Sequence, residues 1–216
     1  SSPSYDKLRL YFRETTKNIT YLTSVLCKDT GFPFQLTLPP GTYQVTVNSG
    51  YYRSPQNFPQ PESGLPVVRD ALVVAGNLSG QVLDLRTHTV TGAFTLNGAP
   101  PTIDTSTCSS TSSPSYDKLR LYFRETTKNI TYLSSVLCKD TGFPFQVVLP
   151  PGTYQVTVNS GYYRSPQKFP QPESGLPVVK DALAVSSDLN GQVLDLKTNT
   201  VSGSFTLNGA PPTIDT

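Results

Sequence analysis

Few residues of the 216-residue chain have the types and spacing that catalysis or metal binding needs. Its one histidine, His88, is replaced by Asn199 in a second copy of the surrounding sequence, which is unexpected for a repeated general base. Three cysteines with one histidine make a poor zinc set. The acidic residues form no calcium-loop pattern, and no phosphate-binding or nucleophile-elbow motif occurs. We therefore expect a protein that is not an enzyme and has no cofactor or metal.

Three Asn-x-Ser/Thr sequons are candidate glycosylation sites, at Asn18, Asn129 and Asn77. Asn18 and Asn129 are repeat equivalents at apparent strand turns, from which a glycan would project into water. The third sequon is lost in the other copy, where Asp188-Leu189-Asn190 replaces it. Because sequons also arise by chance in a chain rich in Thr and Asn, unmodified surface asparagines are the alternative.

A segment rich in tyrosine and proline, residues 50–61 with a copy at 161–172, is the candidate ligand loop. Aromatic rings beside Arg and Gln suit a carbohydrate or the surface of a partner. The side chains considered for binding are Tyr51, Tyr52, Arg53, Phe58, Tyr162, Tyr163, Arg164 and Phe169. The alternative is a loop stiffened by proline that packs on its own domain.

The composition favours an extracellular all-β protein and excludes two classes of partner. Charged residues are only 15% of the chain, and its 17 basic and 15 acidic residues are interspersed. No basic patch indicates binding to nucleic acid or to an anionic membrane. No apolar run approaches the roughly 20 residues that span a bilayer, so we expect no membrane insertion. The chain also opens without a signal-peptide pattern.

A tandem repeat sets the layout of the chain. Residues 2–12 return as residues 113–123, and positions 1–105 differ from positions 112–216 at only 14 places. The counterparts of residues 106–111 are not among the 216 residues, so the sequence resembles a window cut from a periodic object. An active site seldom needs near-identical copies, whereas a stalk, a filament or a multivalent binder does.

Period-two alternation of apolar residues predicts short strands throughout. It is clearest in residues 8–13, 43–47, 81–86 and 90–96, and weaker in 20–26, 33–38 and 65–74. The strands are separated by Gly/Pro turns such as Pro39-Pro40-Gly41 and by Asn97-Gly98. About seven strands per repeat predict two tandem antiparallel β-sandwiches of the prealbumin or immunoglobulin type.

Three short motifs carry a family resemblance: Val-Thr-Gly-Ala-Phe-Thr-Leu-Asn-Gly-Ala-Pro-Pro at 90–101, Leu-Pro-Pro-Gly-Thr-Tyr-Gln-Val-Thr-Val at 149–158, and Leu-Asp-Leu at 194–196. The pattern resembles the carboxypeptidase regulatory-like (transthyretin-like) β-sandwich, and the order is similar to repeats of very large secreted bacterial surface proteins. In that family a V-x-G strand opens the domain, and PGTY-x-V-x-V forms a central strand. The long Tyr/Pro insertion departs from the pattern.

The resemblance implies shifted domain boundaries. Residues 90–200 would be a complete sandwich, 1–89 a sandwich that lacks its first strand, and 201–216 an orphan first strand. The orphan strand would expose Val201, Phe205 and Leu207, so we expect it to be donated to the next subunit or repeat. Head-to-tail donation that does not close generates a filament. The alternatives are a continuous polyprotein cut at this point and a hairpin that folds residues 90–96 back within their own domain.

The cysteines then predict one disulfide per repeat and an oxidising compartment. Cys27 and Cys138 are repeat equivalents, and Cys108 lies in a Ser/Thr-rich linker that is either a polar spacer or O-glycosylated. In the shifted frame Cys108 pairs with Cys138, which leaves Cys27 without a partner in this chain. The rival pairing is Cys27 with Cys108.

These observations predict a structural repeat protein of an extracellular bacterial fibre or stalk, on the cell surface or in a secreted filament. Its partner would be itself, in a head-to-tail homopolymer, with glycans attached or bound as ligands. The alternative is a multivalent adhesin or carbohydrate-binding module that uses the Tyr/Pro loops.

Overall fold

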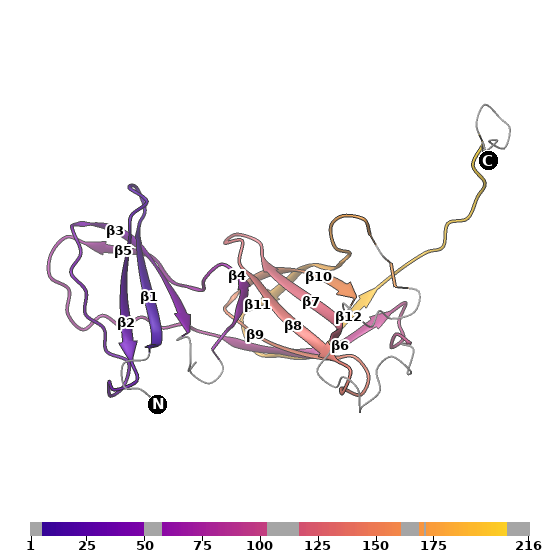
Figure 1. Cartoon of the computed structure of the whole chain (residues 1–216), viewed down its shortest axis with the longest axis horizontal. Helices are drawn as coiled ribbons and strands as arrows, with labels where there is room; N and C mark the ends of the chain where they lie inside the picture. Colours follow the sequence, from indigo (N-terminus) through magenta and orange to yellow (C-terminus); the bar gives the residue numbers. More distant parts are fainter. Residues whose placement is uncertain (1–5, 50–57, 103–116, 161–168, 171, 207–216) are drawn as a thin grey trace, which may run out of the picture.

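The computed structural model describes residues 6–49, 58–102, 117–160, 169–170 and 172–206. These residues form twelve strands and no helix, so the prediction of an all-β fold is confirmed. The strands lie in three sheets (Figure 1). All pairings are antiparallel except one in the third sheet.

The first sheet has the strand order β2-β1-β3-β5. Its strands are β1 (Asp6–Glu14), β2 (Thr20–Leu26), β3 (Gly41–Ser49) and β5 (Val67–Val74). Alternate residues of β1 and β3 point inward, as the sequence pattern predicts. They form a small core of Leu10, Phe12, Tyr43, Val45, Val47 and Leu72. We call residues 6–87 the first unit.

The second sheet has the order β11-β10-β7-β8-β4. Its strands are β7 (Asp117–Glu125), β8 (Thr131–Leu137), β10 (Gly152–Ser160), β11 (Val178–Val185) and β4 (Pro61–Ser63). The first four are repeat equivalents of β1, β2, β3 and β5. The short strand β4 comes from the first unit and adds to the outer edge of β8.

The third sheet has the order β12-β6-β9 and covers the second sheet. It consists of β6 (His88–Leu96), β9 (Pro144–Leu149) and β12 (Leu189–Leu196). The two sheets share one apolar core, to which β6 contributes Val90 and Phe94 and β9 contributes Phe145, Val147 and Leu149. We call residues 88–200 the second unit; it is a two-layered β structure built from β6 to β12.

The two units differ in how many strands they contain. The predicted strands at 33–38 and 81–86 are not strands in the first unit, although their equivalents β9 and β12 are strands in the second. The expectation of about seven strands in each repeat is therefore not confirmed for the first unit among the described residues. The physical reason lies in β6, because both β9 and β12 pair with it rather than with each other.

A tight turn joins β1 to β2 in the first unit and β7 to β8 in the second. Asn18 and Asn129 adopt the left-handed conformation there, with φ of 58° and 55°, which Asn tolerates better than most residues. The buried Glu14 carboxylate accepts hydrogen bonds from the backbone N–H groups of Thr16 and Lys17. The bond from the Lys17 N–H is the main reason why the pKa of Glu14 is lowered. The turn in the second unit repeats this arrangement around Glu125.

Candidate assembly site

The most distinctive feature of the molecule is the place that β6 occupies. This strand directly follows the first unit in the sequence. It lies between β12 and β9, with Val90 opposite both Leu189 and Val147. It is parallel to β12 and antiparallel to β9. Val90 and Phe94 are 0% and 1% exposed, so this strand supplies two of the most deeply buried side chains in the second core.

Phe94 is the central apolar anchor of β6. Its ring lies 6.4 Å from the ring of Phe143 and 6.3 Å from the ring of Phe169, both measured between centroids. Its backbone N–H donates a hydrogen bond of 2.9 Å to the carbonyl oxygen of Phe143. Tilted aromatic contacts at these distances add to the stabilisation that burial provides.

Gly92 lets the backbones of β6 and β12 approach closely. A Cβ atom at this position would lie 1.9 Å from the carbonyl oxygen of Gln192, well inside van der Waals contact. No side chain therefore fits there without moving β12. This contact explains in physical terms why the V-x-G pattern needs its glycine.

A polar latch fixes the end of β6. The carboxylate of Asp195 accepts hydrogen bonds from the Thr95 hydroxyl at 2.8 Å and from the Gly98 N–H at 2.7 Å. Both bonds lower the pKa of Asp195, and the bond from the Gly98 N–H is the larger cause. Beside them Asn97 exchanges two hydrogen bonds with Thr198, at 2.9 Å and 2.8 Å. The latch adds orientation to the apolar contacts of the strand.

The first unit contains the repeat equivalents of β9 and β12, but among the described residues no strand lies between them. Residues 33–38 and 78–85 correspond to β9 and β12, and their apolar side chains Phe34, Leu36, Leu38, Leu83 and Leu85 are only half-buried against the first core. Phe32 is 55% exposed, whereas its equivalent Phe143 is 5% exposed. The carboxylate of Asp84, which corresponds to Asp195, contacts Arg86 at the surface, at 3.3 Å.

The second copy of the β6 sequence lies at the other end of the molecule. Residues 197–206 run away from β12, and 201–206 are in no described strand (Figure 1). Val201 and Phe205 are 94% and 75% exposed, although their equivalents Val90 and Phe94 are buried. Gly203, which corresponds to Gly92, has open space around it. Leu207, the third predicted donor residue, lies outside the described residues.

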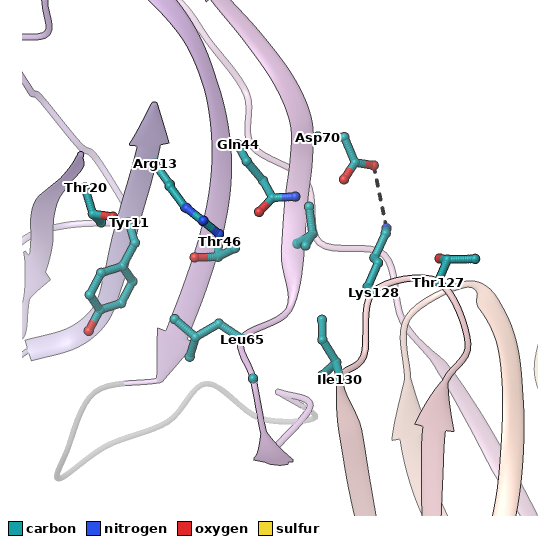
Figure 2. A pocket seen from close by; sticks show the side chains of 12 residues that line it. Tyr11, Arg13, Thr20, Gln44, Thr46, Leu65, Asp70, Thr127, Lys128 and Ile130 are labelled. Carbon is teal, nitrogen blue, oxygen red and sulfur yellow. Dashed lines mark ion pairs between the residues drawn. The ribbon is translucent and has the colours of Figure 1, made fainter. Parts of the chain in front are cut away.

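The two units also meet at a cleft of about 700 Å³ (Figure 2). One wall is the outer face of the first sheet, with Tyr11, Arg13, Gln44 and Thr46, and the other is the turn before β8. Asp70 and Lys128 form an ion pair of 3.6 Å across it. The sequence patterns did not indicate this contact, because each of its side chains reads as an ordinary surface residue.

The cysteines are only partly described. Cys27 is a free, half-buried thiol. Cys138 is disulfide-bonded, and its predicted partner Cys108 lies outside the described residues. The pairing of Cys108 with Cys138 therefore stays a prediction.

The three sequon asparagines are all on the surface. Asn18, Asn129 and Asn77 are exposed, and the side-chain oxygens of the first two accept hydrogen bonds from Arg13 and Arg124, at 2.8 Å and 2.9 Å. Their exposure is compatible with a glycan, and modification stays a prediction.

Two aromatic residues of the candidate ligand loop pack in or against the apolar cores. Phe169 is buried in the second core against Phe94, and Phe58 packs half-buried against the first core. Both rings pack on their own domain, and a role for these two side chains in ligand binding stays a prediction. The other residues of that prediction, Tyr51, Tyr52, Arg53, Tyr162, Tyr163 and Arg164, lie outside the described residues.

Three other properties of the chain concern its one histidine, metal binding and membrane spans. His88 is half-buried, with its Nδ1 atom 3.7 Å from a carboxylate oxygen of Asp188. Within the described parts of the chain, no three His, Cys, Asp or Glu side chains are grouped so that they could hold a metal ion. The same parts contain no helix of the length and apolar character that crossing a membrane requires.

No protein-family model matches the chain, and no curated protein matches it. Among solved structures it is similar to a leucine-rich repeat protein from Bacteroides thetaiotaomicron, with a TM-score of 0.24 and 15% sequence identity. The match covers 92% of this chain and 26% of that one. Similarity at this level carries no conclusion about fold family or function, so function is inferred from the geometry of the chain itself.

Proposed function

We propose that the chain is a structural repeat protein that assembles head to tail by strand complementation. Residues 201–211 of one copy take, in the first unit of the next copy, the place that β6 takes in the second unit. Residues 1–89, 90–200 and 201–216 are then an acceptor sandwich without its first strand, a complete sandwich and a donor strand. In a longer chain the same step would join successive repeats.

The observation that carries this proposal is the contrast between the two copies of one strand. Residues 90–96 form a strand between β9 and β12 with Val90 and Phe94 buried, whereas the repeat equivalents Val201 and Phe205 are exposed. The segments that would flank a donated strand, 33–38 and 78–85, are present in the first unit but are not strands. The contrast supports the proposal, because one chain carries both a segment suited to donation and a unit with the two segments that would flank it.

Burial gives the assembly its driving force. Moving an exposed Val or Phe side chain into a core is worth roughly 1.5–3 kcal/mol each. The donated Phe205 would come to lie against Phe32 and Phe58, as Phe94 lies against Phe143 and Phe169. Backbone hydrogen bonds to both flanking segments would complete a third sheet in the acceptor.

The positions of donor and acceptor favour contacts between copies. The first unit lies at one end of the elongated molecule, and residues 201–206 extend from the other end (Figure 1). A contact between two different surfaces need not close on itself, so repeated donation builds a filament. In this proposal the filament is a fibre or stalk that stands on a bacterial surface or is secreted. The exposed sequon asparagines and the disulfide-bonded Cys138 support an extracellular location.

The test is a comparison of the unchanged chain with Phe205→Asp. The side chain of Phe205 is exposed in its own chain, so the variant should fold normally while losing the ability to enter an apolar core. We expect filaments of the unchanged chain by electron microscopy and sedimentation, and single particles of the variant. A synthetic peptide of residues 200–211, added in excess, should also shorten the filaments. Filaments that are unchanged in the variant, or an unchanged chain that stays monomeric at high concentration, would contradict the proposal.

A further inference from the structure

The contact between the two units within the chain contains a second strand addition, besides that of β6. In it β4 pairs with β8, with Pro61 opposite Tyr132 and Ser63 opposite Thr131. Gly64 follows directly, with a positive φ of 78°, and a Cβ atom there would lie 3.1 Å from the Ile130 side chain. This close fit buries Ile130 to 5% exposure.

The same surfaces occur a second time in the chain, and apolar side chains that the contact would cover are exposed there. All twelve residues that line the cleft between the units are identical in the other repeat. Ile19, the equivalent of Ile130, directly precedes β2 and is 47% exposed, and Leu22 on β2 is also exposed. On the other unit Leu176 and Val178 are exposed, whereas their equivalents Leu65 and Val67 are half-buried.

The strand order leaves an edge for this second contact. β2 lies at the edge of the first sheet, where it corresponds to β8, and β8 carries β4 on its outer side. An edge strand with exposed apolar residues tends to be covered by another strand. Residues 172–174, the equivalents of β4, are exposed and are not a strand in the chain.

We infer that residues 172–174 of one copy pair with β2 of the next copy, as β4 pairs with β8. This inference rests on the proposed head-to-tail function and adds a second interface to it. Gly175 would then cover Ile19, and Asp181 would face Lys17, as Asp70 faces Lys128. The occupant is a second copy of this chain, because the chain already contains both halves of the contact and shows how they fit.

The two contacts act on the same pair of units. In the chain, β4 comes from the first unit and β6 directly follows that unit in the sequence, and both pair with other strands of the second unit. Two separate attachment points fix the orientation of one unit relative to the next. Every junction between units in the filament would therefore be equivalent. The structure of the filament would repeat after each unit rather than after each two-unit chain.

Disulfide trapping tests this contact separately from strand donation. Directly paired antiparallel residues have Cα atoms about 4.5–5.5 Å apart, which suits a disulfide. In a Cys27→Ser background, Ser174→Cys with Thr20→Cys should link successive copies into a covalent ladder on a non-reducing gel. The matched variant Ser63→Cys with Thr131→Cys should form the same bond within one chain and give no ladder.

The possible results distinguish the two proposals. Filaments with a ladder support both, and the ladder should disappear when Phe205→Asp is added. Filaments without a ladder, while the Ser63/Thr131 pair does cross-link, overturn the second interface and leave strand donation intact. Single particles without a ladder overturn both.

A substitution at the same contact measures its strength. Ile19→Asp changes an exposed side chain, so the folding of its own chain should not suffer. We expect it to raise the concentration needed for filament formation about tenfold or more, because a buried Ile contact is replaced by a charge. No change in that concentration would contradict the inference.

Discussion

The first and second units have nearly the same sequence but not the same structure. In the second unit, residues 144–149 and 189–196 are strands of a sheet, and in the first unit their equivalents are irregular. Three of the 14 sequence differences fall in these segments, Leu36 to Val147, Thr37 to Val148 and Ser79 to Asn190, and the other positions are identical. The difference therefore comes from what lies between the segments, which is β6 in one unit and no described strand in the other.

This contrast shows that the third sheet depends on its central strand. In the order β12-β6-β9 the outer strands pair only with β6. Without it, each outer segment would leave its backbone donors and acceptors unpaired, which is costly in a buried place. A segment with a clear alternating pattern thus stays irregular until another part of the chain, or another chain, completes the sheet.

The largest expected effect is in amide hydrogen exchange. Backbone amides of β9 and β12 should be protected by the stability of the whole unit, about 5 kcal/mol or more, whereas amides of 33–38 and 81–86 should exchange roughly a thousandfold faster or more. Mass spectrometry can separate the repeats, because Leu36 and Thr37 correspond to Val147 and Val148. Filament formation should remove the contrast. Equal protection of both segments in the Phe205→Asp monomer would mean that the first unit needs no donated strand.

The next largest effect concerns the two anchoring phenylalanines. Phe94→Ala should lower the free energy of unfolding of the second unit by about 3–5 kcal/mol, because the side chain is buried against Phe143 and Phe169. Phe205→Ala should change it by less than about 0.5 kcal/mol, because that ring is exposed. Urea unfolding of the monomer checks both. Similar losses from the two substitutions would show that residues 201–206 already pack within their own chain.

A smaller effect is expected at the two glycines. Gly92→Ala should destabilise the second unit by about 1–3 kcal/mol, because the new methyl group meets the backbone of Gln192. Gly203→Ala has open space in its own chain and should leave unfolding unchanged. In sedimentation, however, it should raise the concentration for assembly about tenfold or more. Normal assembly of Gly203→Ala would argue against a parallel pairing like that of β6 with β12.

The smallest effect is in the dependence on pH. The lowered pKa of Asp195 means that its contribution to stability is present above the ordinary value of about 3.9 and is lost as the pH falls through the lowered pKa. Asp195→Asn should therefore make unfolding of the second unit less sensitive to acid below about pH 5, as measured by thermal melting. Asp84→Asn is the matched control, since Asp84 contacts Arg86 at the surface. An identical pH profile for Asp195→Asn and the unchanged chain would show that the latch does not contribute.

Several elements of the fold could be predicted because their information is local. Alternating residues in β1 and β3 and the turns at Pro39-Pro40-Gly41 and Asn97-Gly98 reveal strands and their ends. By contrast, β4 is a strand only because β8 offers it an edge, and residues 61–63 carry no alternating pattern. A sequence also does not tell whether an aromatic ring faces inward, so it left open whether Phe58 and Phe169 bind a ligand or pack on their own cores.

The candidate site was predictable only in part. The V-x-G pattern marked residues 90–96 and 201–207 as equivalent strands, and the repeat marked one of them as an extra copy. The parallel partner β12 lies about 100 residues away from β6, and nothing local encodes that pairing. The cleft between the units could not be predicted, because Tyr11, Arg13 and Lys128 are of types common on any surface.

The sequence by itself determined that this protein is all-β, that it is built from two near-identical repeats, and that it holds two copies of one strand. These properties follow from side-chain periodicity and from comparison of the chain with itself. Only the tertiary structure decided that β6 pairs with β9 and β12 rather than folding back on the first unit, and that residues 201–206 and the edge of β2 are exposed. The reason is that burial is a property of pairs of segments, and identical residues are stable as a strand only where a partner covers them.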